Sequence, residues 1–334
     1  MNPLIYYHLK SVFIDSWFFL RGNSLEKSQL PCVPILTYHS IGCSDNSFFP
    51  VLPPTVFEEQ IRYLSKRFRL ITLQTLMSAL SSGVVPKESL VLTFDDGYKD
   101  NFTVALPILK QYGAVGTLFL TTNCIGTGLP LWTDVFGALF QETTVKSLYW
   151  RFGKPETFSW TCSQEKILAF KTIKNLIKTL PEDRKIEVLA DIEEQLGSAS
   201  SFNWSQRMLD WDEVRILHEA GIEIGGHTSS HPILSRISEE QVYRELSDSK
   251  NLIENKIQAP VTSLAYPNGT INDYNEEIQR IAEEVGYRSA CTTIDGVVTS
   301  SSSLFALPRL YTTEPSLSRF AWLLSRNMKK AFQG

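Results

Sequence analysis

Two adjacent carboxylates, Asp95 and Asp96, follow the apolar run LVLTF (residues 90–94) in the segment TFDDGY. Like charges in contact repel each other, and a buried carboxylate is costly unless a cation offsets it. Either both side chains project into water, or a metal ion binds one of them and leaves the other free to act as a base. The remaining sequence bears on this choice.

Histidine is scarce, with five residues in 334. Two of them, His227 and His231, stand four residues apart in the segment GGHTSSHP. That spacing lets both imidazoles face one point on a turn or a helical bend, and the two glycines allow close backbone approach. Two neutral imidazoles and one carboxylate form a ligand set with open positions, which suits Zn²⁺ and also Fe, Co, Ni or Mn. Combined with a strand-terminal Asp-Asp, the pattern predicts a metal site.

Strand-like apolar runs alternate with helical patterns from residue 33 onward. The runs are VPILTY (33–38), FRLI (68–71), LVLTF (90–94), GTLFLTT (116–122), IEIGG (222–226), VTSLAY (261–266), YRSACTT (287–293) and ALPRLY (306–311). Repeated β-α units imply parallel strands, and about seven of them could close into a barrel whose active site lies at the carboxyl ends of the strands. The candidate residues at or just beyond strand ends are His39, Asp95, Asp96, His227, Tyr266 and Arg309.

Capping-box patterns predict three helix starts, at Thr55 with Glu58, at Asp210 with Glu213, and at Ser238 with Gln241. Residues from about 127 to 209 contain helical stretches such as ILAFKTIKNLIKTL but no clear strand–helix unit. We therefore expect an α/β domain over residues 31–334, with a largely helical insertion at about 127–209.

The composition is that of an ordinary globular protein, with 43% hydrophobic and 20% charged residues. The net charge of −4, without a long Lys/Arg block, gives no indication of nucleic-acid binding. The five cysteines are scattered and form no CxxC motif, which favours a reducing compartment.

Residues 1–30 form an N-terminal aromatic amphipathic segment. Its first twenty residues are too interrupted by polar side chains to span a bilayer, and they lack the pattern of a signal peptide. Phe13, Trp17 and Leu20 would share one face of a helix. This helix either packs on the domain or lies at a membrane surface, where aromatic rings are favoured. We expect a cytoplasmic protein, and the second alternative would place it at the inner face of the membrane.

The chain resembles the polysaccharide deacetylases with a NodB-homology domain, carbohydrate esterase family four. TFDDGY and HTSSH are similar to the first two motifs of that family. VPILTYHSIG, LTFDDGYKDN, LPILKQYG, GGHTSSHPIL, AYPNG and LPRL follow the order found in its exopolysaccharide-deacetylase-like members. The resemblance covers most of the chain but neither residues 1–30 nor the insertion. It implies a distorted (β/α)₇ barrel and metal-dependent hydrolysis of an N-acetyl or other acyl group on a sugar.

By this resemblance, Asp96, His227 and His231 would hold the metal ion, with Zn²⁺ as the first choice. Asp95 would be the general base that deprotonates the attacking water. The negative oxygen that develops needs stabilisation by the metal and a backbone N–H. The leaving amine needs a general acid, because its expulsion as an anion is prohibitive.

The sequence departs from the family pattern in two places. Many members have a later Leu-x-His that supplies the acid, but no histidine follows His231, so His39 is the best candidate by elimination. A buried structural histidine is the alternative. Ala265 stands where the family has an arginine, and Arg309 could replace it by orienting Asp95 and lowering its pKa. An ordinary strand-end arginine is equally compatible with the pattern.

Substrate contacts are expected from Tyr266 and from the backbone near Pro267 and Asn268, which would line the acyl pocket. Trp132 could stack on the apolar face of a sugar, or it could pack inside the insertion.

The expected function is hydrolytic removal of an acyl group, N-acetyl above all, from an amino sugar in a glycan or glycan precursor. One alternative is a deformylase or deacetylase of a lipid-linked aminosugar. Another is a non-catalytic glycan-binding protein that retains the fold, which the missing motif arginine and late histidine would fit. The intact pair of metal-site motifs argues against this last alternative.

Overall fold

The computed structural model describes residues 31–42, 47–49, 51–199 and 202–331. The helix expected within residues 1–30, with its possible contact to a membrane, lies outside these ranges. No helix in the described part of the chain is long and apolar enough to cross a bilayer.

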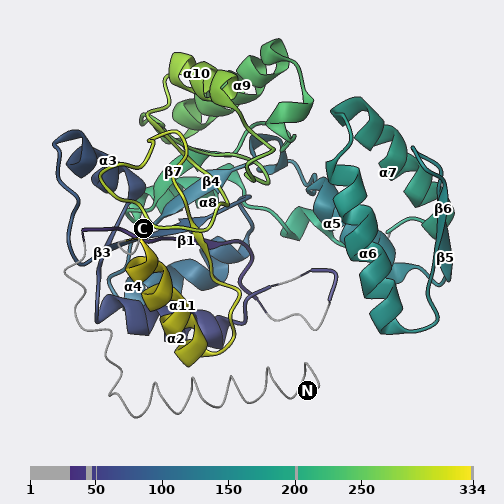
Figure 1. Ribbon diagram of the computed structural model, residues 1–334, viewed down its shortest axis with the longest axis horizontal. Coiled ribbons are helices and arrows are strands. Elements are labelled where there is room, and N and C mark those ends of the chain that lie inside the picture. Colours follow the sequence, from purple (N-terminus) through teal and green to yellow (C-terminus); the bar gives the residue numbers. More distant parts are fainter. Residues whose placement is uncertain (1–30, 43–46, 50, 200–201, 332–334) are drawn as a thin grey trace.

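A curled parallel sheet forms the centre of the molecule (Figure 1). Its strands are β1 (Ile35–Tyr38), β2 (Arg69–Ile71), β3 (Ser89–Phe94), β4 (Thr117–Leu120), β7 (Glu223–Gly226), β8 (Ser263–Ala265), β9 (Ser289–Cys291) and β10 (Leu310–Tyr311). They follow the order β10-β1-β3-β4-β7-β8-β9, and β2 pairs with β3. Leu307, in the segment that leads into β10, exchanges backbone hydrogen bonds with Ala290 and Thr292 at β9. The sheet therefore curls until its two ends meet at this segment, and the predicted distorted (β/α)₇ barrel is confirmed.

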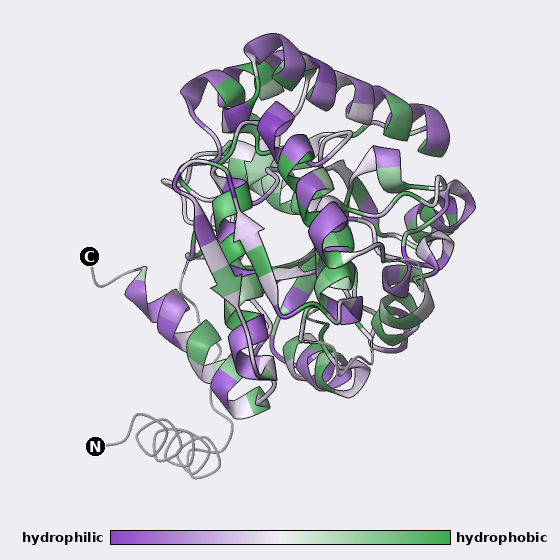
Figure 2. Cartoon of the chain, turned by 90° about the vertical axis from the view of Figure 1, so that its right-hand side faces the viewer, coloured by the Kyte–Doolittle hydropathy of each residue, from purple (hydrophilic) through white to green (hydrophobic). Residues whose placement is uncertain are grey.

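Helices surround this sheet and bury their apolar faces against it. They are α2 (Pro54–Ser65), α3 (Leu73–Ser81), α4 (Leu106–Gln111), α8 (Trp211–Glu219), α9 (Glu239–Ile257), α10 (Glu276–Val285) and α11 (Leu317–Lys330). A π-helical turn (Asn101–Ala105) precedes α4. Hydrophobic residues concentrate on the strands and on the inner sides of the helices, whereas the outer turns are hydrophilic (Figure 2). This segregation is the expected result of removing apolar surface from water.

The helix starts follow local chemistry. The capping boxes predicted at the starts of α8 and α9 are confirmed. The box predicted at Thr55 is wrong, because α2 begins one residue earlier and Thr55 lies inside it. Pro54 occupies the first helical position, where its missing N–H is not needed and its fixed φ suits the helix.

A separate lobe follows β4 in the sequence and lies beside the barrel (Figure 1). It consists of α5 (Trp132–Glu142), β5 (Ser147–Trp150), β6 (Glu156–Ser159), α6 (Ser163–Lys178) and α7 (Glu182–Leu196), all within the expected insertion. The lobe has a hydrophobic cluster of its own, which includes Phe140, Trp160 and Phe170. β5 and β6 form an antiparallel hairpin that the helical patterns did not predict. A long insertion that buries its own apolar surface can keep a fixed shape at the edge of the barrel.

Candidate metal centre and active site

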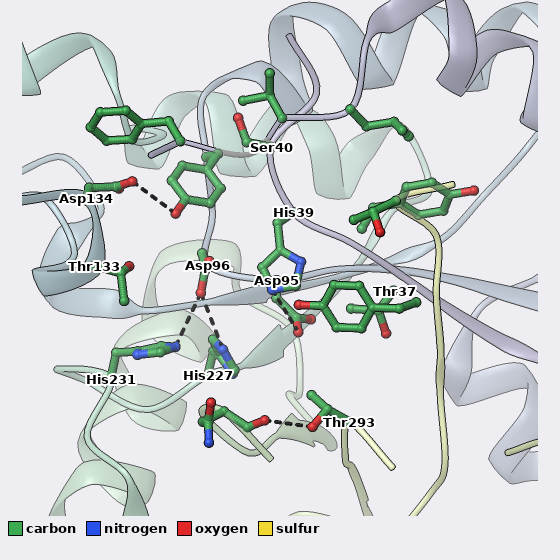
Figure 3. A pocket seen from close by; sticks show the side chains of 18 of the residues that line it. Thr37, His39, Ser40, Asp95, Asp96, Thr133, Asp134, His227, His231 and Thr293 are labelled. Atoms are coloured by element: carbon green, nitrogen blue, oxygen red, sulfur yellow. Dashed lines mark hydrogen bonds and ion pairs between the residues drawn. The ribbon is translucent and has the colours of Figure 1, made fainter. Parts of the chain in front are cut away.

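The carboxyl ends of the parallel strands bring the predicted residues to one cavity (Figure 3). His39 follows β1, Asp95 and Asp96 follow β3, and His227 follows β7. The cavity has a volume of about 450 Å³ and is bounded on one side by the helical lobe. Because every strand points the same way, residues far apart in the sequence meet at a single edge of the sheet.

Three potential metal ligands converge at Asp96. Its Oδ1 atom lies 3.4 Å from Nε2 of His227 and 3.4 Å from Nε2 of His231. The ligand atoms of all three residues lie within 4.8 Å of one another. Oδ1 of Asp96 is buried and has no hydrogen-bond partner in the described structure. A buried carboxylate oxygen without a donor is costly, and a cation bound at this point would offset that cost.

The protonation of the two imidazoles fits metal binding. Nδ1 of His227 lies 2.7 Å from the carbonyl oxygen of Ala265, which can only accept, so Nδ1 carries a proton and Nε2 faces Asp96. Burial, followed by the neighbouring His227, lowers the pKa of His231 to about 3, so that this ring is neutral. Burial also opposes a charge on His227, but the hydrogen bond to Asp96 and the charge of Asp95 outweigh it and raise the pKa of that ring. Two imidazole nitrogens and one carboxylate oxygen thus face one another at a single point. This donor set fits a divalent metal ion.

The backbone around the ligands is held in the left-handed region. Positive φ angles occur at Asp96 (79°), Thr228 (66°), His231 (62°) and Asn268 (61°). This conformation is costly for residues other than glycine and persists where the surroundings enforce it. Thr228 supplies part of that support, because its hydroxyl accepts a hydrogen bond of 2.9 Å from the His231 N–H. The HTSSH segment is therefore a strained loop and not a helical turn.

Asp95 is not one of the three clustered ligands, because both of its carboxylate oxygens are bound by Arg309. The guanidinium donates two hydrogen bonds of 2.8 Å, one to each carboxylate oxygen. Arg309 also donates to the carbonyl of Thr292 (2.7 Å) and to the hydroxyl of Thr93 (3.1 Å). Burial disfavours the ionised carboxyl, but the charge of Arg309, assisted by His227, outweighs it and holds the pKa of Asp95 below its usual value. Asp95 is therefore ionised and fixed in orientation.

His39 lies on the open side of Asp95. Its Nε2 atom is 3.9 Å from Oδ2 of Asp95, and 31% of its side chain is exposed. The ring stacks on Tyr311, with 5.7 Å between the centroids. The side-chain amide of Asn101 donates a hydrogen bond of 2.8 Å to the carbonyl of His39 and fixes the backbone there. His39 thus faces the cavity and is not a buried structural residue.

Comparison with known proteins identifies the family. The model of the family described as polysaccharide deacetylase matches residues 82–290, which is well over half of the chain. The chain belongs to the polysaccharide deacetylase family. It is accordingly a carbohydrate deacetylase, a hydrolase that removes acyl groups from sugars.

Relatives and solved structures agree with this assignment. YxkH of Bacillus subtilis (strain 168), which carries a provisional name as a polysaccharide deacetylase, is 25% identical over 85% of this chain and 73% of its own length. Deacetylase PplD of Streptococcus pyogenes, solved in complex with acetate, has a TM-score of 0.59 at 21% identity, covering 89% of this chain and 98% of that chain. IcaB from Ammonifex degensii has a TM-score of 0.55 at 14% identity, covering 87% and 97%. These structures share the fold of this polysaccharide deacetylase.

The residues expected to bind substrate in this polysaccharide deacetylase differ in their placement. Trp132 and Asn268 line the cavity. Tyr266 borders it but is fully buried, with its hydroxyl hydrogen-bonded to the Phe305 carbonyl (3.1 Å). Pro267, between Tyr266 and Asn268, is buried and is not among the described residues that line the cavity, so its contact with substrate stays a prediction.

Sequence reasoning missed a buried ion pair in the cavity wall. Asp134 on α5 pairs with Arg207, with 3.1 Å between Oδ1 and Nη2. The same Asp134 atom accepts a hydrogen bond of 3.4 Å from Tyr98, which follows the DDG motif. The partners Asp134 and Arg207 are 73 positions apart, and no local pattern connects residues at that separation. Two lysines of α6, Lys174 and Lys178, were missed for the same reason.

Metal binding provides a direct test of the division between ligand and base. We expect His227→Ala to weaken Zn²⁺ binding by more than about 100-fold, because loss of even an outer partner of a ligand costs about 10–100-fold. Asp95→Asn should bind Zn²⁺ almost as well as the wild type, since Asp95 is engaged by Arg309. Titration calorimetry of the metal-free proteins measures both, with His218→Ala on α8 as a matched histidine control. Equal loss of Zn²⁺ in the Asn and Ala variants would contradict the division.

The Arg309–Asp95 pair makes a prediction about stability and pH. Arg309→Met leaves a buried carboxylate without its partner and should cost about 3–5 kcal/mol of unfolding free energy near neutral pH. Because Arg309 lowers the folded pKa of Asp95, its stabilising effect is present above the unfolded pKa of about 4 and is lost as the pH falls through the folded value. The difference between variant and wild type should therefore shrink in acid.

Urea denaturation at a series of pH values measures this difference. Arg319→Met is the control, because Arg319 is exposed and its ion pair with Glu314 lies in contact with solvent, so the change in stability should be less than about 1 kcal/mol. A difference for Arg309→Met that stays constant from neutral pH into acid would refute the electrostatic explanation.

Proposed function

We propose that this protein is a metal-dependent hydrolase that removes the N-acetyl group from an amino sugar in a glycan or glycan precursor. The observation that carries the proposal is the separation of two adjacent carboxylates into different roles. Asp96 faces the Nε2 atoms of two imidazoles, whereas Asp95 is held by Arg309 and faces the cavity. This is the arrangement needed for a metal ligand next to a general base.

Asp96, His227 and His231 would hold the metal ion. A divalent ion there would polarise the acyl carbonyl and lower the pKa of water toward about 7. Zn²⁺ is the proposed ion, and Co, Ni, Fe or Mn are compatible with the same nitrogen and oxygen donors.

Asp95 acts as the general base. Each of its oxygens accepts one hydrogen bond from Arg309 and keeps a second lone pair, so the carboxylate can still take a proton from the attacking water. Arg309 also stops Asp95 from rotating toward the metal ligands. The water oxygen then bonds to the acyl carbon while its proton moves to Asp95.

The loop after β8 offers a donor for the negative charge that develops on the acyl oxygen. Asn268 has a positive φ and lines the cavity, and its backbone N–H has no acceptor within the described residues. Two hydrogen bonds fix this loop. The backbone carbonyl of Asn268 accepts one of 2.7 Å from the Thr293 hydroxyl, and the side-chain amide of Asn268 donates one of 2.5 Å to the Asp273 carboxylate. A preorganised donor of this kind stabilises a transition state without reorganisation.

His39 acts as the general acid. It stands next to Asp95 and opens to the cavity, where it can donate a proton to the amine nitrogen as the carbon–nitrogen bond breaks. Acetate and the free amino sugar then leave. Since no later histidine exists in the sequence, His39 takes the role that the family's Leu-x-His motif supplies elsewhere.

Acetate release tests the proposed reaction. We expect turnover of N-acetylglucosamine oligomers with Zn²⁺, loss of turnover after chelation, and recovery when Zn²⁺ is added back. Asp95→Asn should lower kcat by about 10²–10⁴, because a general base contributes that factor. A wild type that binds Zn²⁺ but turns over no acylated sugar would sink the proposal and favour a glycan-binding role.

The assignment of His39 has a separate test. His39→Gln should lower kcat by about 10²–10⁴ through loss of the proton donor, while Zn²⁺ content stays at the wild-type value. His218→Gln, far from the cavity on α8, is the matched control and should keep full activity. If His39→Gln loses less than about tenfold in kcat, another group must protonate the amine.

A further inference from the structure

Two lysines from the helical lobe reach the same cavity as the catalytic groups. Lys174 and Lys178 are four residues apart on α6 and both line the cavity wall. That spacing places the two side chains on one face of the helix, one turn apart. Both side chains are partly buried.

Neither lysine forms an ion pair with a residue that the structure describes. Within the described residues no carboxylate lies within 4.0 Å of either ammonium group, whereas Lys185 of the next helix pairs with Glu182 at 2.5 Å. Lys178 donates a hydrogen bond of 2.5 Å to the side-chain oxygen of Asn268. The Lys174 ammonium lies 5.7 Å from the centre of the Phe170 ring. Burial, followed by repulsion from Lys178, lowers the pKa of Lys174, as expected for like charges held together.

The carboxylates of the cavity are already engaged by other partners. Asp95 is held by Arg309, and Asp134 is held by Arg207. Asp96 belongs to the proposed metal site. Asp273, which binds the Asn268 side chain, favours the charged form of Lys178 but forms no ion pair with it. The lysines therefore form a positive region in the cavity wall without an ion pair of their own, and an anion brought by a ligand could pair with them directly.

Building on the proposed function, we propose that Lys174 and Lys178 form a subsite for an anionic group, a phosphate or a carboxylate, carried by the acylated sugar. Two ammonium groups one helical turn apart can each donate to a different oxygen of such a group. The substrate would then be an anionic amino-sugar derivative, with its acyl group at the metal centre and its charge against α6. The helical lobe would select the substrate, and the barrel would carry out the hydrolysis.

Lys178 also connects this subsite to the catalytic loop through Asn268, the residue proposed to stabilise the developing oxyanion. Substitution of Lys178 should therefore change kcat as well as substrate preference. Lys174 has no such contact and is the cleaner probe. Lys171, exposed on the same helix and away from the cavity, is the matched control.

The test compares kcat/KM for three acylated substrates with Zn²⁺-loaded protein. These are neutral N,N′-diacetylchitobiose, its 1-phosphate, and a disaccharide whose N-acetylmuramic acid carries a carboxylate. We expect the wild type to favour at least one anionic substrate by about tenfold or more, since a charged hydrogen bond contributes about that factor. Whether phosphate or carboxylate is preferred identifies the source of the anion.

The variants then locate the effect. Lys174→Gln should lower the anionic-to-neutral ratio toward one, with Lys178 accounting for any remainder. Lys174→Arg should restore most of the ratio, and Lys171→Gln should keep the wild-type value. Added salt should reduce the wild-type preference, because screening weakens exposed charge interactions.

The outcomes separate this inference from the proposed function. Turnover of all three substrates at equal kcat/KM would overturn the anionic subsite and leave the deacetylase proposal intact. An anionic preference that Lys174→Gln does not alter would also overturn the subsite. If no substrate is turned over, the proposed reaction fails, and calorimetric binding of the 1-phosphate to wild type and Lys174→Gln still decides the subsite.

Discussion

The bidentate ion pair between Arg309 and Asp95 is the interaction on which the arrangement of this site depends. It neutralises one of two carboxylates that follow β3, and it leaves the other to face the imidazoles of His227 and His231. Without the guanidinium, both carboxylates would compete for the same cation and repel each other in a buried place. Arg309 also contacts β3 and the end of β9, so the pair links the catalytic base to the closure of the barrel.

The parallel sheet explains why so much of this site could be predicted from the sequence. A strand-terminal position is a local property, which apolar runs indicate, and the carboxyl ends of parallel strands meet at one edge. Asp95, Asp96, His39 and His227 could therefore be placed together without any structure. Contacts that depend on the path of the insertion could not. The ion pair of Asp134 with Arg207 and the lysines of α6 reach the cavity only because the lobe folds back beside the barrel.

Other differences between the sequence-based predictions and the structure have local physical causes. The β5–β6 hairpin consists of two four-residue strands, too short for a clear alternation in the sequence. Helix α2 begins at Pro54, which occupies the first helical position, and not after the predicted cap Thr55. The loop at 227–231 shows that HxxxH spacing alone does not specify a helix, because a strained turn brings the two rings together equally well.

The left-handed backbone at two of the ligand positions restricts how the metal preference of this protein could be re-engineered. Aspartate and histidine are among the few residue types with a side chain that enter this region readily, and Asp96 and His231 both occupy it. Exchanging either for cysteine or glutamate would add backbone strain to any change in ligand chemistry. His227 does not have a positive φ, and the Ala265 carbonyl orients its ring. Position 227 is therefore the ligand position at which substitution for a softer or harder metal ion is least restricted by the backbone.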